Sequence, residues 1–189
     1  MESKNSKKST IQNVVFIVLI ALLLFSPLGT FVKVHLNRLM AFSPKTIAIK
    51  DQKRLSSFQW QLKDVDGKTV SLSTYKGKII FINFWATWCP PCIAEMPSIQ
   101  KLYVDYQDKM VFLFVTTDSF DKANAFMVKE NLTLTVYQSV TNPPIEMESS
   151  TIPATYLIDQ QGNIIVAKIG TADWNSDSFR VKLEALLKK

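Results

Sequence analysis

Cysteine and histidine are scarce in this sequence: its 189 residues include two cysteines and one histidine. A structural zinc ion takes four Cys or His ligands, so the chain lacks the set that such a site needs, and we expect no metal. A bridge between the two cysteines, Cys89 and Cys92, would close a very short loop and constrain little of the unfolded chain. We therefore expect these residues to matter for their reactivity.

Acidic residues are nearly absent from the first part of the chain. Residues 1–50 contain seven Lys or Arg and one acid, whereas residues 51–189 contain fifteen of each, so the net charge of +6 belongs to the N-terminal part. Affinity for nucleic acid comes from clustered Lys and Arg that release counterions from phosphates. Because the remainder of the chain is neutral, we do not expect it to bind nucleic acid.

Charge of either sign is missing from residues 9–32, where the segment 14–25 is the unbroken apolar run VVFIVLIALLLF. A membrane-spanning helix needs about 20 mostly apolar residues. The sequence therefore predicts a short basic N-terminus at 1–10 and a single transmembrane anchor over 11–32, in which Pro27 is tolerated near one end.

Two other interpretations of this apolar segment stay open. A cleaved signal peptide fits the basic residues Lys4, Lys7 and Lys8, but no small-x-small cleavage site follows the apolar run, so an uncleaved anchor is favoured. A buried core helix is less consistent with so apolar a terminus. The Lys and Arg counts on the two sides of the span are nearly balanced, so they do not fix its orientation.

A juxtamembrane linker is expected at residues 33–54, because residues 43–54 are polar, mixed and without a lasting period. His35 lies in this stretch, and we expect it to have a surface role rather than a catalytic one. The remaining residues, 55–189, are enough for one domain.

Hydrophobic periodicity predicts the elements of that domain. In chain order they are a hairpin of residues 58–62 and 69–72, a buried strand 78–85, a helix after Cys92, a strand 110–116, a helix 122–130, a short strand 132–137, a hairpin of 155–158 and 164–169, and a last helix capped by Ser176. This order predicts an α/β fold with a central mixed sheet and helices on both faces, and it excludes an all-β fold.

The two cysteines fall where the buried strand turns into the helix. At a helix N-terminus, unpaired N–H groups and the helix dipole favour a thiolate, so we expect the pKa of Cys89 to lie below the ordinary value of about 8.5. We expect its sulfur to be exposed, with that of Cys92 nearby, one turn inside the helix and less exposed. Pro90 and Pro91 rigidify the first turn but remove two N–H donors.

The segment FINFWATWCPPCIAEMP, together with Pro97 and the run TIPAT at residues 151–155, resembles the thioredoxin superfamily. Within it the chain is similar to the membrane-anchored TlpA, ResA and CcmG-like proteins, also called redoxin domains, over residues 56–189. The resemblance implies a thioredoxin-like fold and a protein-disulfide oxidoreductase with no cofactor beyond its own cysteine pair. Cys89 would be the nucleophile and Cys92 the resolving cysteine.

The resemblance also implies roles for residues around the cysteines. Pro153 would follow a cis peptide bond against the disulfide, and the backbone of Ile152 would pair with a substrate strand. Trp88 and Pro90 would contact the substrate. Glu95 would transfer a proton to or from Cys92 if it is partly buried. The alternative for Glu95 is a solvated helix residue.

By the same resemblance, the catalytic domain lies on the extracytoplasmic side of a bacterial cytoplasmic membrane. Its partners would be a protein with a disulfide or dithiol, apocytochrome c included, and a separate thiol protein that donates electrons. The direction of exchange depends on redox differences finer than a motif shows. A peroxiredoxin-like peroxidase, a Cu(I)-binding module and a domain with an idle disulfide are the alternatives.

Overall fold

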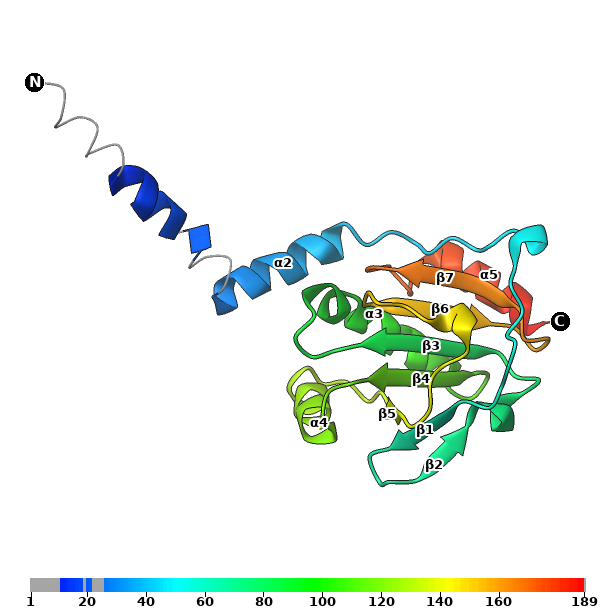
Figure 1. The fold of residues 1–189 in the computed structure, drawn as a ribbon. Helices are drawn as coiled ribbons and strands as arrows, with labels where there is room; N and C mark the ends of the chain where they lie inside the picture. Colours follow the sequence, from blue (N-terminus) through cyan, green and yellow to red (C-terminus); the bar gives the residue numbers. More distant parts are fainter. Residues whose placement is uncertain (1–10, 19, 22–25, 189) are drawn as a thin grey trace, which may run out of the picture.

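The computed structural model describes residues 11–18, 20–21 and 26–188. A seven-stranded sheet forms its centre, in the order β2-β1-β5-β4-β3-β6-β7 (Figure 1). The strands are β1 Gln61–Asp64, β2 Thr69–Ser71, β3 Ile80–Trp85, β4 Val111–Thr116, β5 Val136–Ser139, β6 Ala154–Ile158 and β7 Ile164–Ile169. Residues 11–18 and 20–21 are helical. The helices that follow are α2 Pro27–Leu39, α3 Pro90–Tyr106, α4 Phe120–Lys129 and α5 Asp177–Leu187, with short 3-10 helices η1 Ile49–Asp51, η2 Leu72–Tyr75 and η3 Ile145–Met147.

The predicted mixed sheet is confirmed. Strand β4 runs parallel to both β3 and β5, whereas β3 pairs antiparallel with β6. Five of the six residues of β3 are buried, as expected for an apolar strand covered on both faces. The carboxyl end of β3 leads directly to the cysteine pair.

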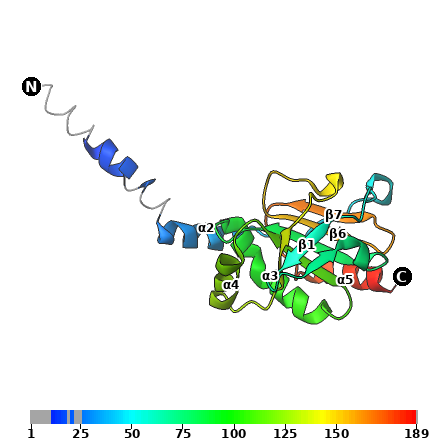
Figure 2. The same ribbon diagram turned by 60° about the horizontal axis from the view of Figure 1, so that its bottom comes forward.

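The sheet faces are covered differently from the prediction. Buried residues of α3, α4 and α5 share one apolar cluster, and Figure 2 shows these helices along one side of the sheet. The other cluster contains Leu72 of η2 and Met147 of η3, so 3-10 turns and loops cover that face instead of α-helices. The reason is that β3, β4 and β5 follow one another in one direction across the sheet, and right-handed crossovers then place α3 and α4 on the same face.

Local differences from the predicted elements have identifiable causes. The strand predicted at 132–137 begins at Val136, because the N–H of Thr133 donates to the side chain of Gln100 at 2.8 Å and not to a neighbouring strand. Ser176 occupies the N-cap position of α5, but its hydroxyl donates to the carbonyl of Asp173 at 3.1 Å and does not cap the helix.

The predicted anchor lies partly outside the described residues, since residues 19 and 22–25 belong to none of the described ranges. The predicted basic segment 1–10 also lies outside them. No helix in the part of the chain that the structure describes has the length and apolarity needed to cross a membrane. Helix α2 begins inside the predicted anchor, where Ser26 Oγ accepts a hydrogen bond from the N–H of Gly29 at 3.1 Å. It continues into the predicted linker and packs against α3 (Figure 1).

The second half of the predicted linker is hydrogen-bonded to the domain. The N–H of Ile47 donates to the carbonyl of Ile165 at 2.8 Å, and the N–H of Ile164 donates to the carbonyl of Lys53 at 2.8 Å. Strand β7 is the last strand of the sheet, and this segment satisfies part of its otherwise unpaired edge.

Candidate active site

The cysteine pair lies at the start of α3, as the sequence predicts. Cys89 is the N-cap residue, with Pro90 and Pro91 in the first turn, and it forms a disulfide with Cys92 across a Cα–Cα distance of 5.2 Å. The N–H of Cys92 points at Cys89 Sγ over 3.3 Å. On reduction, this donor and the positive end of the helix dipole would both stabilise negative charge on that sulfur.

The expectation that Cys89 is exposed is wrong, since its exposed fraction is 4%. Cys89 packs in the same apolar cluster as Trp85, and the carbonyl oxygen of Ile152 lies 3.8 Å from its sulfur. The disulfide sulfur has no hydrogen to donate, so this is a packing contact. Cys92 is fully buried, in agreement with the expectation that it is the less exposed of the two.

The loop before β6 lies directly against the disulfide. The Ile152–Pro153 peptide bond is cis, as the resemblance implies. Ile152 is half-buried and Pro153 is buried, and the carbonyl of Pro153 accepts a hydrogen bond from the N–H of Gly170 at 2.8 Å.

Glu95 lies inside the protein with 1% of its surface exposed, so the solvated alternative is wrong and the burial is more complete than expected. Oε1 accepts a hydrogen bond from Asn83 Nδ2 at 2.9 Å. Oε2 accepts from Trp174 Nε1 at 3.0 Å and from the N–H of Ala172 at 3.3 Å. Glu95 follows Cys92 by three residues, about one turn further along α3.

Burial raises the pKa of Glu95 from 4.5 to about 7. The donors Trp174, Asn83 and Ala172 act in the opposite sense, because each of them stabilises the carboxylate. The loss of hydration outweighs them. A carboxyl that titrates close to neutral pH can both give and take a proton.

Sequence reasoning missed the residues that hold this carboxyl. Asn83 is a polar residue inside the apolar run of β3, which was a usable signal, and its amide also donates to Thr155 Oγ1 at 2.8 Å. Trp174 carried no such signal, because it lies outside every motif and reaches Glu95 across 79 positions of sequence.

The loop from Gly170 to Trp174 joins several parts of the site. Besides its contacts to Pro153 and Glu95, it binds the first turn of α3, since Thr171 Oγ1 donates to the carbonyl of Pro91 at 3.0 Å. It also meets the N-terminal segment, since the N–H of Asp173 donates to the carbonyl of Phe42 at 3.0 Å.

The two tryptophans near the cysteines differ in environment. Trp85 is 2% exposed and packs on Phe126 of α4, so it belongs to the core. Trp88 is 68% exposed beside the disulfide, and Pro90 is half-buried. Pro97 lies inside α3.

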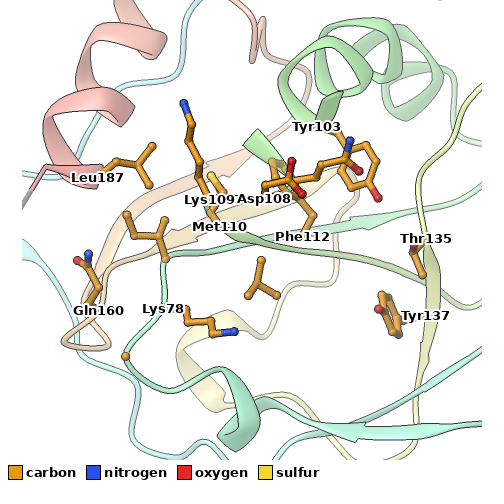
Figure 3. A pocket seen from close by; sticks show the side chains of 14 residues that line it. Lys78, Tyr103, Asp108, Lys109, Met110, Phe112, Thr135, Tyr137, Gln160 and Leu187 are labelled. Carbon is orange, nitrogen blue, oxygen red and sulfur yellow. The ribbon is translucent and has the colours of Figure 1, made fainter. Parts of the chain in front are cut away.

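Two hollows differ in their relation to this site. One, of about 460 Å³, is lined by Trp85, the carboxyl ends of β4 and β5, and Ile152, whose carbonyl oxygen lies 3.8 Å from Cys89 Sγ. The other, of about 520 Å³, lies where β3 and β4 begin, and Figure 3 shows Lys78, Lys109 and Leu187 around it. This second hollow lies at the opposite end of the strands from the disulfide.

Comparison with known proteins gives consistent relatives. The model of the AhpC/TSA family matches residues 54–167. The thioredoxin-like protein YneN of Bacillus subtilis (strain 168) is 32% identical over 139 residues, which is 71% of this chain and 81% of YneN. The thiol-disulfide oxidoreductase ResA of Geobacillus thermodenitrificans (strain NG80-2) is 32% identical over 128 residues, 66% of this chain and 72% of ResA.

A solved structure agrees on the fold. The crystal structure of a thiol:disulfide interchange protein of the thioredoxin family from Chlorobium tepidum TLS is similar with a TM-score of 0.57, covering 72% of this chain and 99% of that one. The sequence identity is 23%, so this likeness supports the thioredoxin-like fold alone.

Proposed function

The chain belongs to the AhpC/TSA family and is a thiol-disulfide oxidoreductase with Cys89 and Cys92 as its active-site pair, and on this premise we propose that it reduces disulfides of partner proteins outside the cytoplasm of a bacterium. Residues 11–32 anchor it to the cytoplasmic membrane in this proposal, and residues 55–189 form the catalytic domain. Maturation of c-type cytochromes is one process that needs such a reductant.

The observation that carries the proposal is the placement of the Cys89 sulfur. It caps α3, faces the N–H of Cys92 at 3.3 Å and lies beside the backbone of Ile152. Reactive cysteines are found at helix N-termini, where the thiolate is favoured. Since Ile152 is half-buried beside the hollow at the ends of β4 and β5, its backbone can receive an extended segment of the partner.

The reaction is a two-electron exchange. The Cys89 thiolate attacks one sulfur of the partner disulfide, which breaks that bond and leaves the other partner sulfur as a thiolate. Cys92 then attacks Cys89 Sγ, which releases the second partner sulfur and closes the Cys89–Cys92 disulfide. The partner gains two electrons and the enzyme loses two, so a separate dithiol protein must reduce the pair again.

Glu95 handles the proton of Cys92 in this scheme. Cys92 must lose its proton to attack, and a buried carboxyl with a pKa of about 7, one turn along α3, can accept it. Trp88 supplies an exposed aromatic surface next to the disulfide, which gives the partner an apolar contact. In this proposal the half-buried Pro90 also contacts the partner, and the buried Pro153 supports the backbone of Ile152 beside it.

Trapping the mixed disulfide tests the proposal. Cys92→Ser should still attack a partner disulfide but fail to release it, so a covalent complex accumulates that a strong reductant dissolves. Cys89→Ser should form no complex and reduce no insulin. Turnover of hydrogen peroxide without a thiol substrate, or full exchange activity of Cys89→Ser, would contradict the proposal.

A further inference from the structure

Helix α2 has an apolar face that no part of the described chain covers. Its exposed apolar residues recur at spacings of three and four, and they are Leu28, Phe31, Val32, Leu36 and Leu39. At 3.6 residues per turn these positions lie within one half of the helix circumference. The exposed His35 is a polar residue on the same face, with its ring 4.0 Å from that of Phe31. Leu39 is 83% exposed, and Met40 and Phe42 extend the apolar surface past the end of the helix.

The opposite side of α2 is bound to the domain. Val34 is buried, and the helix packs against α3 (Figure 1). Arg38 and Ala41 line a hollow together with Pro97 of α3 and Asp173. The apolar face of α2 therefore points away from the domain, because the other side of the helix is held against α3.

The charge around this face has one sign. Residues 26–50 contain four cations, Lys33, Arg38, Lys45 and Lys50, and no acidic residue, while the chain from residue 51 onward is neutral. A second copy of the chain would bring two such cationic helices together. A bilayer that contains anionic lipids has an apolar interior and an anionic surface. It therefore complements both the apolar face of α2 and the positive charge around that face.

From this geometry we infer that α2 lies in the interface of an anionic bilayer, with Leu28, Val32 and Leu36 inserted below the headgroups and Lys33 at the level of the phosphates. Ser26 begins a new helix at the end of the apolar run, so α2 can turn from a spanning direction into the membrane plane. Because α2 packs on α3, the helix that begins at Cys89 is held beside the membrane. The inference extends the anchoring in the proposed function.

Spin labels on the full chain in lipid vesicles test this. A maleimide nitroxide is attached through Leu36→Cys, with the active-site disulfide closed so that Cys89 and Cys92 do not react. Val128→Cys is the matched control, because Val128 is an exposed apolar residue on α4, outside α2. Thr30→Cys reports a different side of α2. Collision with oxygen measures lipid exposure, and collision with a water-soluble nickel chelate measures aqueous exposure.

With phosphatidylglycerol present, the oxygen-to-nickel ratio at position 36 should exceed that at position 128 several-fold, and it should fall in vesicles of phosphatidylcholine alone. Position 30 should give a lower ratio than position 36. A ratio at position 36 equal to that at 128 overturns the inference, and equal depth at 30 and 36 shows a spanning helix instead. Dipolar broadening at 36 without oxygen exposure shows a second copy on this face, which also overturns it.

Flotation of the same vesicles distinguishes failure of the inference from failure of the proposed function. If the chain does not float with lipid, the anchoring in the proposed function fails together with the inference. If it floats while position 36 remains aqueous, the inference alone fails. Insulin reduction by the unlabelled chain tests the dithiol chemistry independently of both.

Discussion

The indole N–H of Trp174 donates a hydrogen bond to Oε2 of Glu95 at 3.0 Å. Both side chains are buried, and they come from the loop after β7 and from α3. The loop after the last strand therefore holds the carboxyl that lies one turn beyond Cys92, and it sets how easily that carboxyl ionises.

Replacing this donor should change the titration of Glu95. Trp174→Phe removes a group that stabilises the carboxylate, so the pKa of Glu95 should rise above its value of about 7. The free energy of unfolding should also fall by about 1–3 kcal/mol, because a buried hydrogen bond is lost. Carbon NMR of the Glu95 carboxyl and the pH profile of insulin reduction measure the first effect, and urea unfolding measures the second.

Trp60→Phe is the matched control for this variant. Trp60 is equally buried, and its indole N–H donates to the carbonyl of Thr141 at 3.1 Å. It belongs to the other apolar cluster, whereas Trp174 packs in the cluster of α3. It should lose stability in the same way without moving the pH profile. If both variants shift the profile equally, the Trp174 contact has no specific effect on Glu95.

Glu95 should make the folded state less stable as pH rises. The unfolded carboxyl ionises near 4.5 and the folded one near 7, so between these values the folded state binds more protons than the unfolded state. Stability from this group is present in full below pH 4.5 and is lost as pH rises through about 7. The interval of about 2.5 units, at about 1.36 kcal/mol each, corresponds to on the order of 3 kcal/mol.

Glu95→Gln removes this titration and keeps the side-chain size. The difference in free energy of unfolding between the variant and the original chain, measured with urea on the oxidised forms, should therefore grow in favour of Gln as pH rises from 4.5 past 7. A difference that stays constant with pH would mean that Glu95 titrates normally in the folded protein.

Pro91→Ala should make Cys89 reactive at lower pH. Pro91 is the second residue of α3 and has no N–H, so Cys89 Sγ receives a hydrogen bond from Cys92 alone among the first-turn amides. An added donor at position 91 should shift the midpoint of alkylation against pH downward by roughly half a unit, which corresponds to about 0.7 kcal/mol at a helix N-terminus. Pro97→Ala, two turns further along α3, should leave the midpoint in place.

The parts of the site that are local in sequence were predictable, and the parts made by distant segments were not. The strand ending at Trp85 and the helix beginning after Cys89 follow from an apolar run and a motif at its end. The cis bond before Pro153 followed from resemblance alone. The burial of Cys89 depends on Ile152, which is 63 residues away, and no pattern near Cys89 carries that information.

The prediction that helices cover both faces of the sheet was wrong for a related reason. Periodicity predicts that α3 and α4 exist, but the face that each covers depends on which strands are neighbours. The position of β5 beside β4 is set by pairing of residues such as Phe114 with Val136, which a single sequence does not reveal. Asn83 is the intermediate case. Its polarity inside the apolar strand β3 indicates a special role, but the sequence does not indicate that its hydrogen-bond partner is Glu95.

Gly162 should be less tolerant of a side chain than Gly67, although both have positive φ angles, +86° and +80°. The backbone at both positions is left-handed, and a residue with a Cβ in this conformation costs about 1–2 kcal/mol. At Gly162 that Cβ would also lie 3.0 Å from the ring of Phe58, whereas nothing lies within 4 Å at Gly67. Gly162→Ala should therefore lower the free energy of unfolding more than Gly67→Ala, and Gly162→Ala combined with Phe58→Leu should recover part of the difference. Equal losses in the two single variants, measured by urea unfolding, would show that the contact with Phe58 does not restrict position 162.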